Sequence, residues 1–328
     1  SRWLTADPVA RTRPAAAVPV TNAQIAAGSV GYASSYNSGS WYGDLEAYSL
    51  DLATGLQNGG TQWSFRDRLN AQPPSSRKIA SWNGTSGVPF TTANGNAFRT
   101  TTPALTDGVI NYIRGNRTGE GTTYRARSYL LGDIINAEPV VVNYTGVPVV
   151  YQAANDGLLH VIDGRVHASV ATRGQELWAY VPRIVHPKLP GRADPYFQHE
   201  YLVDSTPATA EVTGVGTVGR ILAGGLGKGG AGYYALDITT PTAANEAAAA
   251  AKVLWESRLA NMGYSFGTPL IVNTAQGWRV VVASGYRNDA AAGGTGGDGR
   301  GHVWVVDPAT GAGGKEFVTT PGAGLAHP

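Results

Sequence analysis

The chain has 328 residues, of which 42% are hydrophobic and 15% charged, and it carries a formal net charge of +2 and no cysteine. So weak a charge, without any run of more than two Lys or Arg residues, argues against nucleic acid as a partner. The lack of cysteine excludes disulfides, thiolate metal sites and Cys nucleophiles, and no apolar stretch is long enough to span a membrane.

The first 40 residues are rich in Ala, Pro, Ser, Thr and Gly, with prolines at positions 8, 14 and 19. We expect residues 1–40 to form a linker or an extended arm ahead of a single β-domain at 41–328. The chain begins with Ser1 rather than Met and shows no signal-peptide pattern. The sequence is therefore expected to be a fragment or a processed product.

An alternating strand opens the domain. The segment WYGDLEAYSLDLATG at 41–55 alternates apolar and polar residues up to Asp51, and a turn then leads towards Trp63. The motif D-x-A-T-G at Asp51 returns at Asp307, where the glycine again supplies a turn after a strand.

An insertion of loops and helix is expected at about 57–124. The pairs Asn83-Gly84 and Asn94-Gly95 are typical of hairpin turns. A helix is predicted from Pro103 to Arg114, with Thr102 as its cap, because apolar residues recur there at helical spacing.

From residue 138 onward one phrase recurs: a polar residue before proline, an apolar run, a glycine step, and a second apolar run ending in Asp. The copies run from Glu138 to Asp163, from Thr206 to Asp237 and from Thr268 to Asp307. With 44 glycines and 19 prolines in the chain, such a repeat predicts β-propeller blades. Counting 41–55 as a degenerate copy, we expect about four blade units of about 65 to 75 residues.

Tryptophans follow the repeated phrase. Trp178 and Trp255 come 15 and 18 residues after their aspartates, and each is expected to lie on the next strand and to pack against a neighbouring blade. The alanine run in Asn245–Lys252 predicts a short surface helix between strands.

The polar residues of the repeat are interpreted as structural. Asp163, Asp237 and Asp307 each end a strand, where a carboxylate can accept backbone N–H groups of the following turn. Asn155-Asp156-Gly157 is a β-turn signal. His160 and His302 occupy corresponding positions after the glycine step, which favours blade packing over metal ligation.

Two glycine-rich loops have a composition that resembles ligand-binding loops. Asp289 and Asp298 flank one of them and are weak metal candidates, because calcium requires more oxygen ligands at closer spacing. The loop 224–230 lacks the G-x-x-x-x-G-K-[ST] pattern of a phosphate loop and is predicted to be a tight turn that exposes Lys228.

An ion pair is expected next to the insertion. Arg125 and Arg127, with Asp133 nearby, are predicted to anchor the helix to the first full blade, because the guanidinium group can bind a carboxylate through two hydrogen bonds.

Several segments share an order and spacing that identify a family. They are WYGDLEAYSLD at 41–51, NYIRGNR at 111–117, YRARSYLLGDIINAEPVVV at 124–142, YQAANDGLLHVIDG at 151–164, YYALDIT at 233–239 and GHVWVVDPATG at 301–311. Together they resemble the C-terminal propeller of the PilY/PilC family of type IV pilus tip-associated proteins, over roughly residues 40–328.

The resemblance implies a modified quinoprotein-like β-propeller, exported and placed at the cell surface, the outer membrane or the pilus tip. It implies roles in the balance of pilus assembly and retraction, in twitching motility and in attachment to surfaces or host cells. Minor pilins, the pilus tip complex and a host-cell or surface receptor are the implied partners.

The resemblance also implies calcium for the longer parent protein. The family carries an EF-hand-like calcium loop after a G-L-x-x-P segment, which matches Gly324 to Pro328 here. We therefore expect the calcium loop and the closing blades to be missing from this chain, and no cofactor to be bound by its own residues.

Two alternatives of other classes remain open. A quinone-dependent dehydrogenase would share the D-x-A-T-G…W pattern, but no cluster of acidic and amide ligands is visible in the sequence. An outer-membrane assembly scaffold would share the blades but not the RARSYLLGDI segment. No H-E-x-x-H or G-x-S-x-G motif occurs, so no catalytic residue is predicted.

Overall fold

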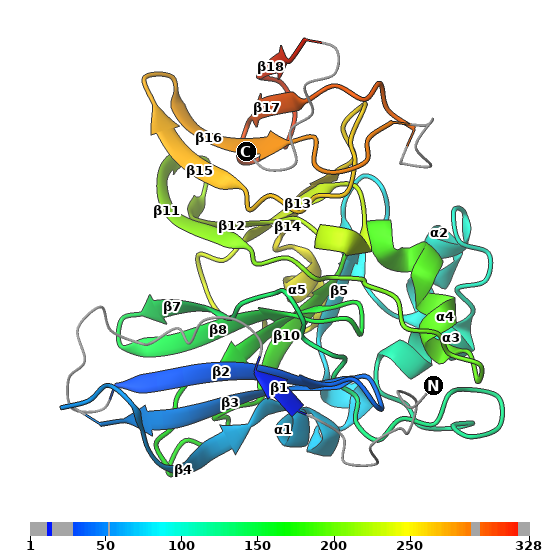
Figure 1. The fold of residues 1–328 in the computed structure, drawn as a ribbon, viewed down its shortest axis with the longest axis vertical. Coiled ribbons are helices and arrows are strands. Elements are labelled where there is room, and N and C mark those ends of the chain that lie inside the picture. The colour runs from blue at the N-terminus through cyan, green and yellow to red at the C-terminus, as the bar shows by residue number, and fades with distance from the viewer. Residues whose placement is uncertain (1–11, 15–28, 52, 290–295, 321–328) are drawn as a thin grey trace, which may run out of the picture.

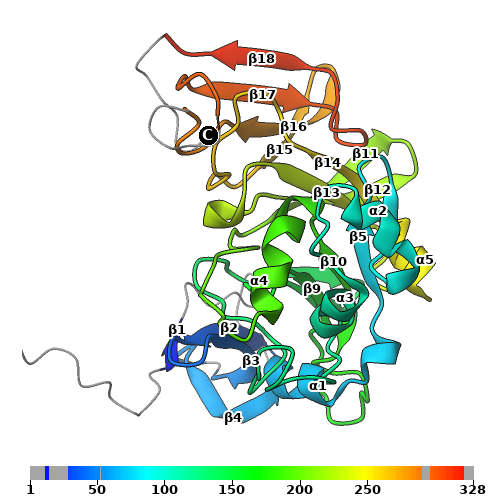
Figure 2. The same cartoon turned by 90° about the vertical axis from the view of Figure 1, so that its right-hand side faces the viewer.

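Four β-sheets follow one another along the chain. The structure, a computed structural model, describes residues 12–14, 29–51, 53–289 and 296–320. In Figures 1 and 2 the sheets succeed one another from the blue N-terminal sheet to the orange and red C-terminal sheet. Strands that are consecutive in sequence pair antiparallel within each sheet, which is the architecture of propeller blades. The prediction of an all-β propeller with about four blade units is confirmed.

We number the sheets as blades 1 to 4. Blade 1 contains β1 (Thr12–Pro14), β2 (Val30–Asn37), β3 (Tyr42–Leu50) and β4 (Gln57–Ser64). Blade 2 contains β7 (Val140–Tyr144), β8 (Val147–Ala153), β9 (Leu159–Asp163) and β10 (Glu176–Val181), with β5 (Ile79–Trp82) and β6 (Gly87–Pro89) added beyond β10. Blade 3 contains β11 (Ala208–Val215), β12 (Val218–Gly224), β13 (Tyr233–Asp237) and β14 (Val253–Ser257). Blade 4 contains β15 (Leu270–Thr274), β16 (Gly277–Ala283), β17 (His302–Val306) and β18 (Lys315–Val318).

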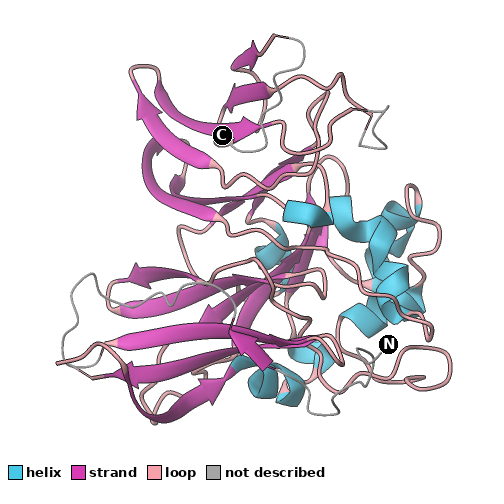
Figure 3. Ribbon diagram, in the orientation of Figure 1, coloured by secondary structure: helices cyan, strands magenta, loops and turns pink. Residues whose placement is uncertain are grey.

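The helices are short and lie outside the sheets. Figure 3 shows α2, α3 and α4 together on one side of the sheets. The helices are α1 (Phe65–Ala71), α2 (Gly95–Arg99), α3 (Asp107–Ile113), α4 (Leu189–Ala193) and α5 (Glu246–Ala250), with 3₁₀ turns η1 (Pro74–Ser76), η2 (Thr92–Asn94), η3 (Arg183–Lys188) and η4 (Gly227–Gly229). None of the helices in the described part of the chain is long and apolar enough to cross a membrane.

A tryptophan on the fourth strand of blades 1, 2 and 3 binds the next blade. The indole N–H of Trp63 donates to the carbonyl of Arg165 (3.0 Å), that of Trp178 to Pro241 (3.0 Å), and that of Trp255 to Pro308 (2.9 Å). Each indole is buried in the hydrophobic core that lies between two successive sheets. The repeated tryptophans therefore join blades through apolar packing and one directed hydrogen bond.

Glycine makes room for two of these indoles. A Cβ atom at Gly174 would lie 2.7 Å from the Trp63 ring, and one at Gly311 would lie 2.5 Å from the Trp255 ring. Both glycines also have positive φ, 69° and 65°. The glycine of the D-x-A-T-G turn at 307–311 is therefore required by close packing as well as by backbone conformation.

The expectation of a linker or arm at 1–40 is wrong for part of that range. Strand β2 pairs along its whole length with β3, and β1 pairs with β2. In the segment VGYASSYN, Tyr32 and Ser34 are buried and Ala33 and Ser35 are less so, which suits a blade strand despite its small polar side chains. The domain therefore begins before residue 41.

The insertion at about 57–124 contains more sheet than expected. Residues 57–64 form the fourth strand of blade 1, and β5 pairs in parallel with β10, so the insertion widens blade 2 to six strands. Helix α5, which the alanine run predicts, packs against β5 and β6. It is capped by Asn245, whose side chain accepts the Ala248 N–H. Parallel pairing joins segments far apart in sequence, which is why local pattern did not reveal it.

The helix predicted from Pro103 starts four residues later. Turn residues precede α3, and Thr106, not Thr102, accepts the Val109 N–H at its N-cap. Thr102 is instead buried at the end of the preceding turn. Asp107 in the first turn favours a helix that begins after Thr106.

Candidate functional site

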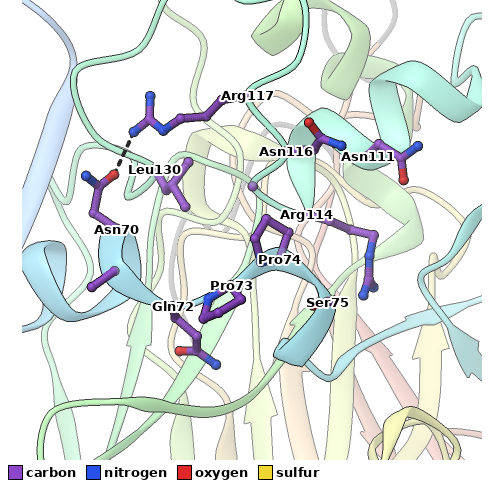
Figure 4. A pocket seen from close by; sticks show the side chains of 12 residues that line it. Asn70, Gln72, Pro73, Pro74, Ser75, Asn111, Arg114, Asn116, Arg117 and Leu130 are labelled. Carbon is purple, nitrogen blue, oxygen red and sulfur yellow. Dashed lines mark hydrogen bonds between the residues drawn. The ribbon is translucent and has the colours of Figure 1, made fainter.

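A polar cavity of about 630 Å³ opens beside the helices of the insertion. One wall is the end of α1 with η1, and the other is the end of α3 with the loop after it, as Figure 4 shows. The lining residues are Asn70, Ala71, Gln72, Pro73, Pro74, Ser75, Asn111, Arg114, Gly115, Asn116, Arg117 and Leu130. A cavity of this size is within the usual range for binding sites.

The first wall is shaped by a helix end and two prolines. Helix α1 is capped by Ser64, which accepts the Asp67 N–H, and it ends at Gln72 in an extended conformation. Pro73 and Pro74 cannot continue an α-helix, and Pro74 instead starts the 3₁₀ turn η1. The two rings therefore present a rigid, partly apolar surface to the cavity.

The second wall holds two arginines that are already paired. Arg114 binds Glu246 of α5 (2.6 Å) and donates to the Phe90 carbonyl (2.8 Å). Arg117 binds Glu120 (2.9 Å), and it donates to the Asn70 side-chain oxygen across the cavity (2.6 Å; Figure 4). These guanidinium groups hold the walls together and have little capacity left for a ligand.

Amide side chains supply the remaining hydrogen-bonding groups. Asn111 is exposed at the cavity, and the Oε1 atom of Gln72 is buried without a hydrogen-bond partner, while its Nε2 donates to the Glu176 carbonyl. No His, Asp or Glu lines the cavity. The groups present can bind a neutral, hydrogen-bonding ligand such as a peptide backbone, and they include no general acid or base.

A buried chain of charges lies behind the cavity. Arg77 donates to the Arg114 carbonyl (3.0 Å) at the end of α3 and binds Glu176 of β10 (2.8 Å). Glu176 in turn contacts His160 of β9 (2.7 Å), and His160 contacts Asp156 in the turn before it (3.1 Å). This chain ties the cavity wall to the centre of blade 2.

The charges of this chain stabilise one another. Burial alone would lower the pKa of His160, but the carboxylates of Asp156 and Glu176 raise it to about 9. Burial alone would raise the pKa of Glu176, but Arg77 and His160 lower it to about 2. At neutral pH the imidazole is therefore a cation between two carboxylates.

The strand-end aspartates bind their own turns. Asp163 accepts the Arg165 N–H (3.1 Å) and pairs with the Arg165 guanidinium, Asp237 accepts the Thr239 N–H (2.9 Å), and Asp307 accepts the Ala309 and Thr310 N–H groups (2.9 and 3.0 Å). Trp178 and Trp255 lie on β10 and β14 and make the interblade hydrogen bonds described above. The D-x-A-T-G…W pattern that suggested a quinone enzyme is thus used for contacts between blades.

The predicted pairing of Arg125 and Arg127 with Asp133 is wrong. Arg127 binds Glu120 (2.7 Å), and Asp133 binds His199 (2.8 Å) and Asn155 (2.8 Å). The backbone separates these residues, because Asp133 turns inward towards blade 2 and is fully buried. Proximity in sequence was not a sufficient guide to an ion pair.

The weak metal candidates lie at the base of one loop. Asp289 is bridged to Gly297 and Asp298, and Asp298 binds His302 (2.9 Å); residues 290–295 between them lie outside the described residues. Within the described ranges, no group of three or more His, Asp or Glu side chains is arranged to hold a metal ion. Lys228 is exposed on η4, and a strand follows it, as the tight-turn interpretation predicts.

Sequence reasoning did not single out Arg77, Gln72, Asn111 or Glu176. Glu176 carried a faint signal, a charged residue directly before the apolar run LWAYV of a buried strand. Asn111 lies in the family segment NYIRGNR but was not assigned to a site, Arg77 and Gln72 lie in a polar segment with no motif, and only the tertiary structure brings these residues together.

Successive antiparallel sheets joined by buried tryptophans define a β-propeller domain. The family model described as "PilY1 beta-propeller domain" matches residues 133–325, more than half of the chain. The chain belongs to this family.

Named relatives agree with the family. A "Type IV pilus biogenesis factor PilY1 homolog" of Xylella fastidiosa is 33% identical over 304 residues, which cover 82% of this chain and 23% of the relative. "Type IV pilus biogenesis factor PilY1" of Pseudomonas aeruginosa strain PAK is 32% identical over 322 residues, covering 83% of this chain and 26% of the relative. The chain thus spans about a quarter of the length of these relatives.

A solved structure is also similar to the chain. The crystal structure of the Pseudomonas aeruginosa PilY1 C-terminal domain is 29% identical and covers 54% of this chain and 32% of its own, with a TM-score of 0.38.

Proposed function

We propose that this chain is the propeller part of a type IV pilus biogenesis factor and that it acts by binding, without turnover. The observation that carries the proposal is the family match over residues 133–325, together with relatives that are themselves named as pilus biogenesis factors. The cavity supports it, since its lining offers hydrogen bonds and rigid apolar rings but no acid or base.

The finer functions rest on the family resemblance. The longer protein is exported to the cell surface or pilus tip, and it supports the balance of pilus assembly and retraction, twitching motility and attachment. Its partners are minor pilins and the tip complex. Calcium is part of this proposal, as a ligand of the EF-hand-like loop that the resemblance implies for the family.

The cavity is the contact point that we assign to a pilus partner. An extended peptide segment offers N–H groups for the unpartnered Gln72 oxygen and carbonyl groups for the Asn111 amide. The prolines restrict the wall, so little conformational entropy is lost on binding.

A gene deletion and a filled cavity test the proposal. Deletion in the source bacterium is expected to abolish surface pili and twitching; normal piliation and attachment would refute the role in biogenesis. Asn111→Trp fills the cavity from the exposed face of α3 and breaks no side-chain hydrogen bond of the described structure. It is expected to reduce piliation, whereas Asn58→Trp, at an exposed position of β4, is the matched control.

The two variants separate the function from its site. Full piliation in Asn111→Trp, with loss in the deletion, would leave the biogenesis role intact and remove the cavity from it. Equal loss in Asn58→Trp would show a general effect of the added indole.

A further inference from the structure

Two arginines, Arg192 buried and Arg125 half-buried, lie beneath one aromatic ring and form no ion pair in the described part of the chain. Arg192 of α4 is only 5% exposed, and Arg125 lies beside it, its backbone N–H donating to the Ala193 carbonyl (2.9 Å). The Phe197 ring covers both, with guanidinium carbons 3.5 Å (Arg125) and 5.0 Å (Arg192) from its centroid. Within the described ranges, neither arginine forms an ion pair with a carboxylate.

Each guanidinium keeps a buried donor that binds nothing. The Nη1 atoms of Arg125 and Arg192 are buried and have no hydrogen-bond partner, whereas Nη2 of Arg125 donates to the Ser40 carbonyl (2.8 Å). Arg127 in the same segment is the contrast, because it binds Glu120 and donates to the Tyr112 and Asn116 carbonyls.

The nearby carboxylates contact other groups, although Oδ1 of Asp133 is buried without a hydrogen-bond partner. Asp133 binds His199 and Asn155, and Asp156 binds His160 and accepts the Gly132 N–H (3.1 Å). They influence the two arginines through space without contacting them. Burial and the neighbouring positive charge of Arg192 lower the pKa of Arg125 to about 10, and they outweigh the opposite effect of Tyr112 and Asp133.

Such a pair is unfavourable as it stands. A buried charge is normally compensated by an ion pair or by hydrogen bonds, and two adjacent cations also repel each other. Contact with the face of a phenylalanine ring offsets only part of this cost. A negatively charged group with several acceptor oxygens would compensate both charges and accept the free N–H donors.

We propose that Arg125 and Arg192 form a binding site for an oxyanion, a phosphate or a carboxylate group, beneath the loop 194–200. Guanidinium groups suit both anions because their N–H donors match pairs of oxygen atoms. The loop that covers the site is mostly exposed, and Tyr196 beside Phe197 is 90% exposed, while the far end of the loop is held by His199, which binds Asp133. The site is separate from the polar cavity and does not depend on the proposed function.

Thermal unfolding of the full chain tests the site with simple probes. Sodium phosphate and sodium acetate are compared with sodium chloride at equal ionic strength and pH, so that general screening cancels. We expect phosphate, acetate or both to raise the melting temperature above that in chloride, because a ligand bound only to the folded state stabilises it. A response to phosphate alone assigns a phosphate group, and a response to acetate assigns a carboxylate. Equal melting temperatures in all three salts would overturn the proposal.

Substitutions locate the response. Arg192→Gln and Arg125→Gln are expected to weaken anion affinity at least about tenfold, and Arg300→Gln, which removes the same charge at an exposed position, is expected to leave it unchanged. In chloride, Arg192→Gln is expected to be no less stable than the wild type, since it removes an uncompensated buried charge. An undiminished response in both site variants, or the same loss in Arg300→Gln, would overturn the assignment.

If the glutamine variants fail to fold, a more conservative variant tests anion binding at the site. Phe197→Leu keeps both arginines and removes the aromatic face, so the folded chain is expected to depend more strongly on the anion. Titration of wild type and Phe197→Leu with inorganic phosphate, followed by ³¹P NMR line broadening, should show binding in both. An absence of broadening in both would count against the site.

Discussion

Blades 2 and 4 contain the same cluster of three side chains in different surroundings. In blade 2, His160 lies between Asp156 (3.1 Å) and Glu176 (2.7 Å); in blade 4, His302 lies between Asp298 (2.9 Å) and Glu316 (2.7 Å). In both blades the first carboxylate precedes the histidine by four residues and the second lies on the next strand.

The difference lies in burial. The Glu176 side chain is fully buried and also binds Arg77, whereas the Asp298 and Glu316 side chains are 37% and 45% exposed. The same geometry therefore makes a strongly coupled ionic chain in blade 2 and a solvent-screened one in blade 4. Repetition of a motif does not imply repetition of its energetic contribution.

Removal of the buried carboxylate should have the largest effect. Glu176→Gln leaves Arg77, which is 2% exposed, without its counterion, and we expect the free energy of unfolding to fall by about 3–5 kcal/mol. Glu316→Gln, the matched change in blade 4, is expected to cost less than about 1 kcal/mol. Guanidinium chloride unfolding of both variants measures the difference, and equal losses would contradict the comparison.

The second largest effect is expected in the pH dependence of stability, to which His160 should contribute much more than His302. The folded-state pKa of His160 is raised from 6.5 to about 9, so its stabilisation is complete below pH 6.5 and is lost as the pH rises through 9. We expect the wild type to lose about 3 kcal/mol over this interval. Urea unfolding at several pH values checks it.

Two variants identify the group responsible for that loss. His160→Gln should flatten the profile between pH 6.5 and 9, and His302→Gln should leave most of it. The pKa of His302 is also raised, since Asp298 and Glu316 outweigh a partial burial that would lower it, but solvent screens its partners. If His160→Gln left the pH profile of the unfolding free energy unchanged, another titrating group would be responsible for the loss.

Substitutions of the equivalent aromatic residues on the fourth strands should differ in their cost in unfolding free energy, but by a smaller amount. Trp178 pairs with Val161 of β9, and Phe317 pairs with Val303 of β17, in the same register relative to the two histidines. Trp178 is fully buried and hydrogen-bonded to Pro241, whereas Phe317 is 50% exposed. We expect Trp178→Phe to cost about 1–2 kcal/mol through the lost hydrogen bond, and Phe317→Ala under about 1 kcal/mol. A larger loss in Phe317→Ala, measured by thermal unfolding, would reverse this order.

The smallest effect is expected from the exposed cluster itself. His302→Gln, measured at pH 7 by urea unfolding, should change the free energy of unfolding by about 0.5 kcal/mol or less, because its partners remain solvated. A cost comparable to that of Glu176→Gln would show that blade 4 depends on its cluster as strongly as blade 2 does.

The candidate site was only partly accessible from sequence. The segment NYIRGNR was recognised as a family feature, and its residues line one wall of the cavity. The facing residues at 70–75 contain no motif in the sequence. In the structure, Nε2 of Gln72 donates to the Glu176 carbonyl of β10, and its Oε1 atom has no hydrogen-bond partner. Sequence spacing cannot report a contact between segments that the fold brings together across about a hundred residues.

The repeated phrase of strands, glycine step and terminal Asp was sufficient by itself to predict blades, because alternation, turns and tryptophan spacing are local properties of the chain. Only the tertiary structure decided that β5 joins blade 2, that Arg127 binds Glu120 and not Asp133, and that Arg125 and Arg192 meet beneath Phe197. These outcomes depend on which distant groups are buried together. Burial determines how strongly two charges, or the two partners of a hydrogen bond, interact.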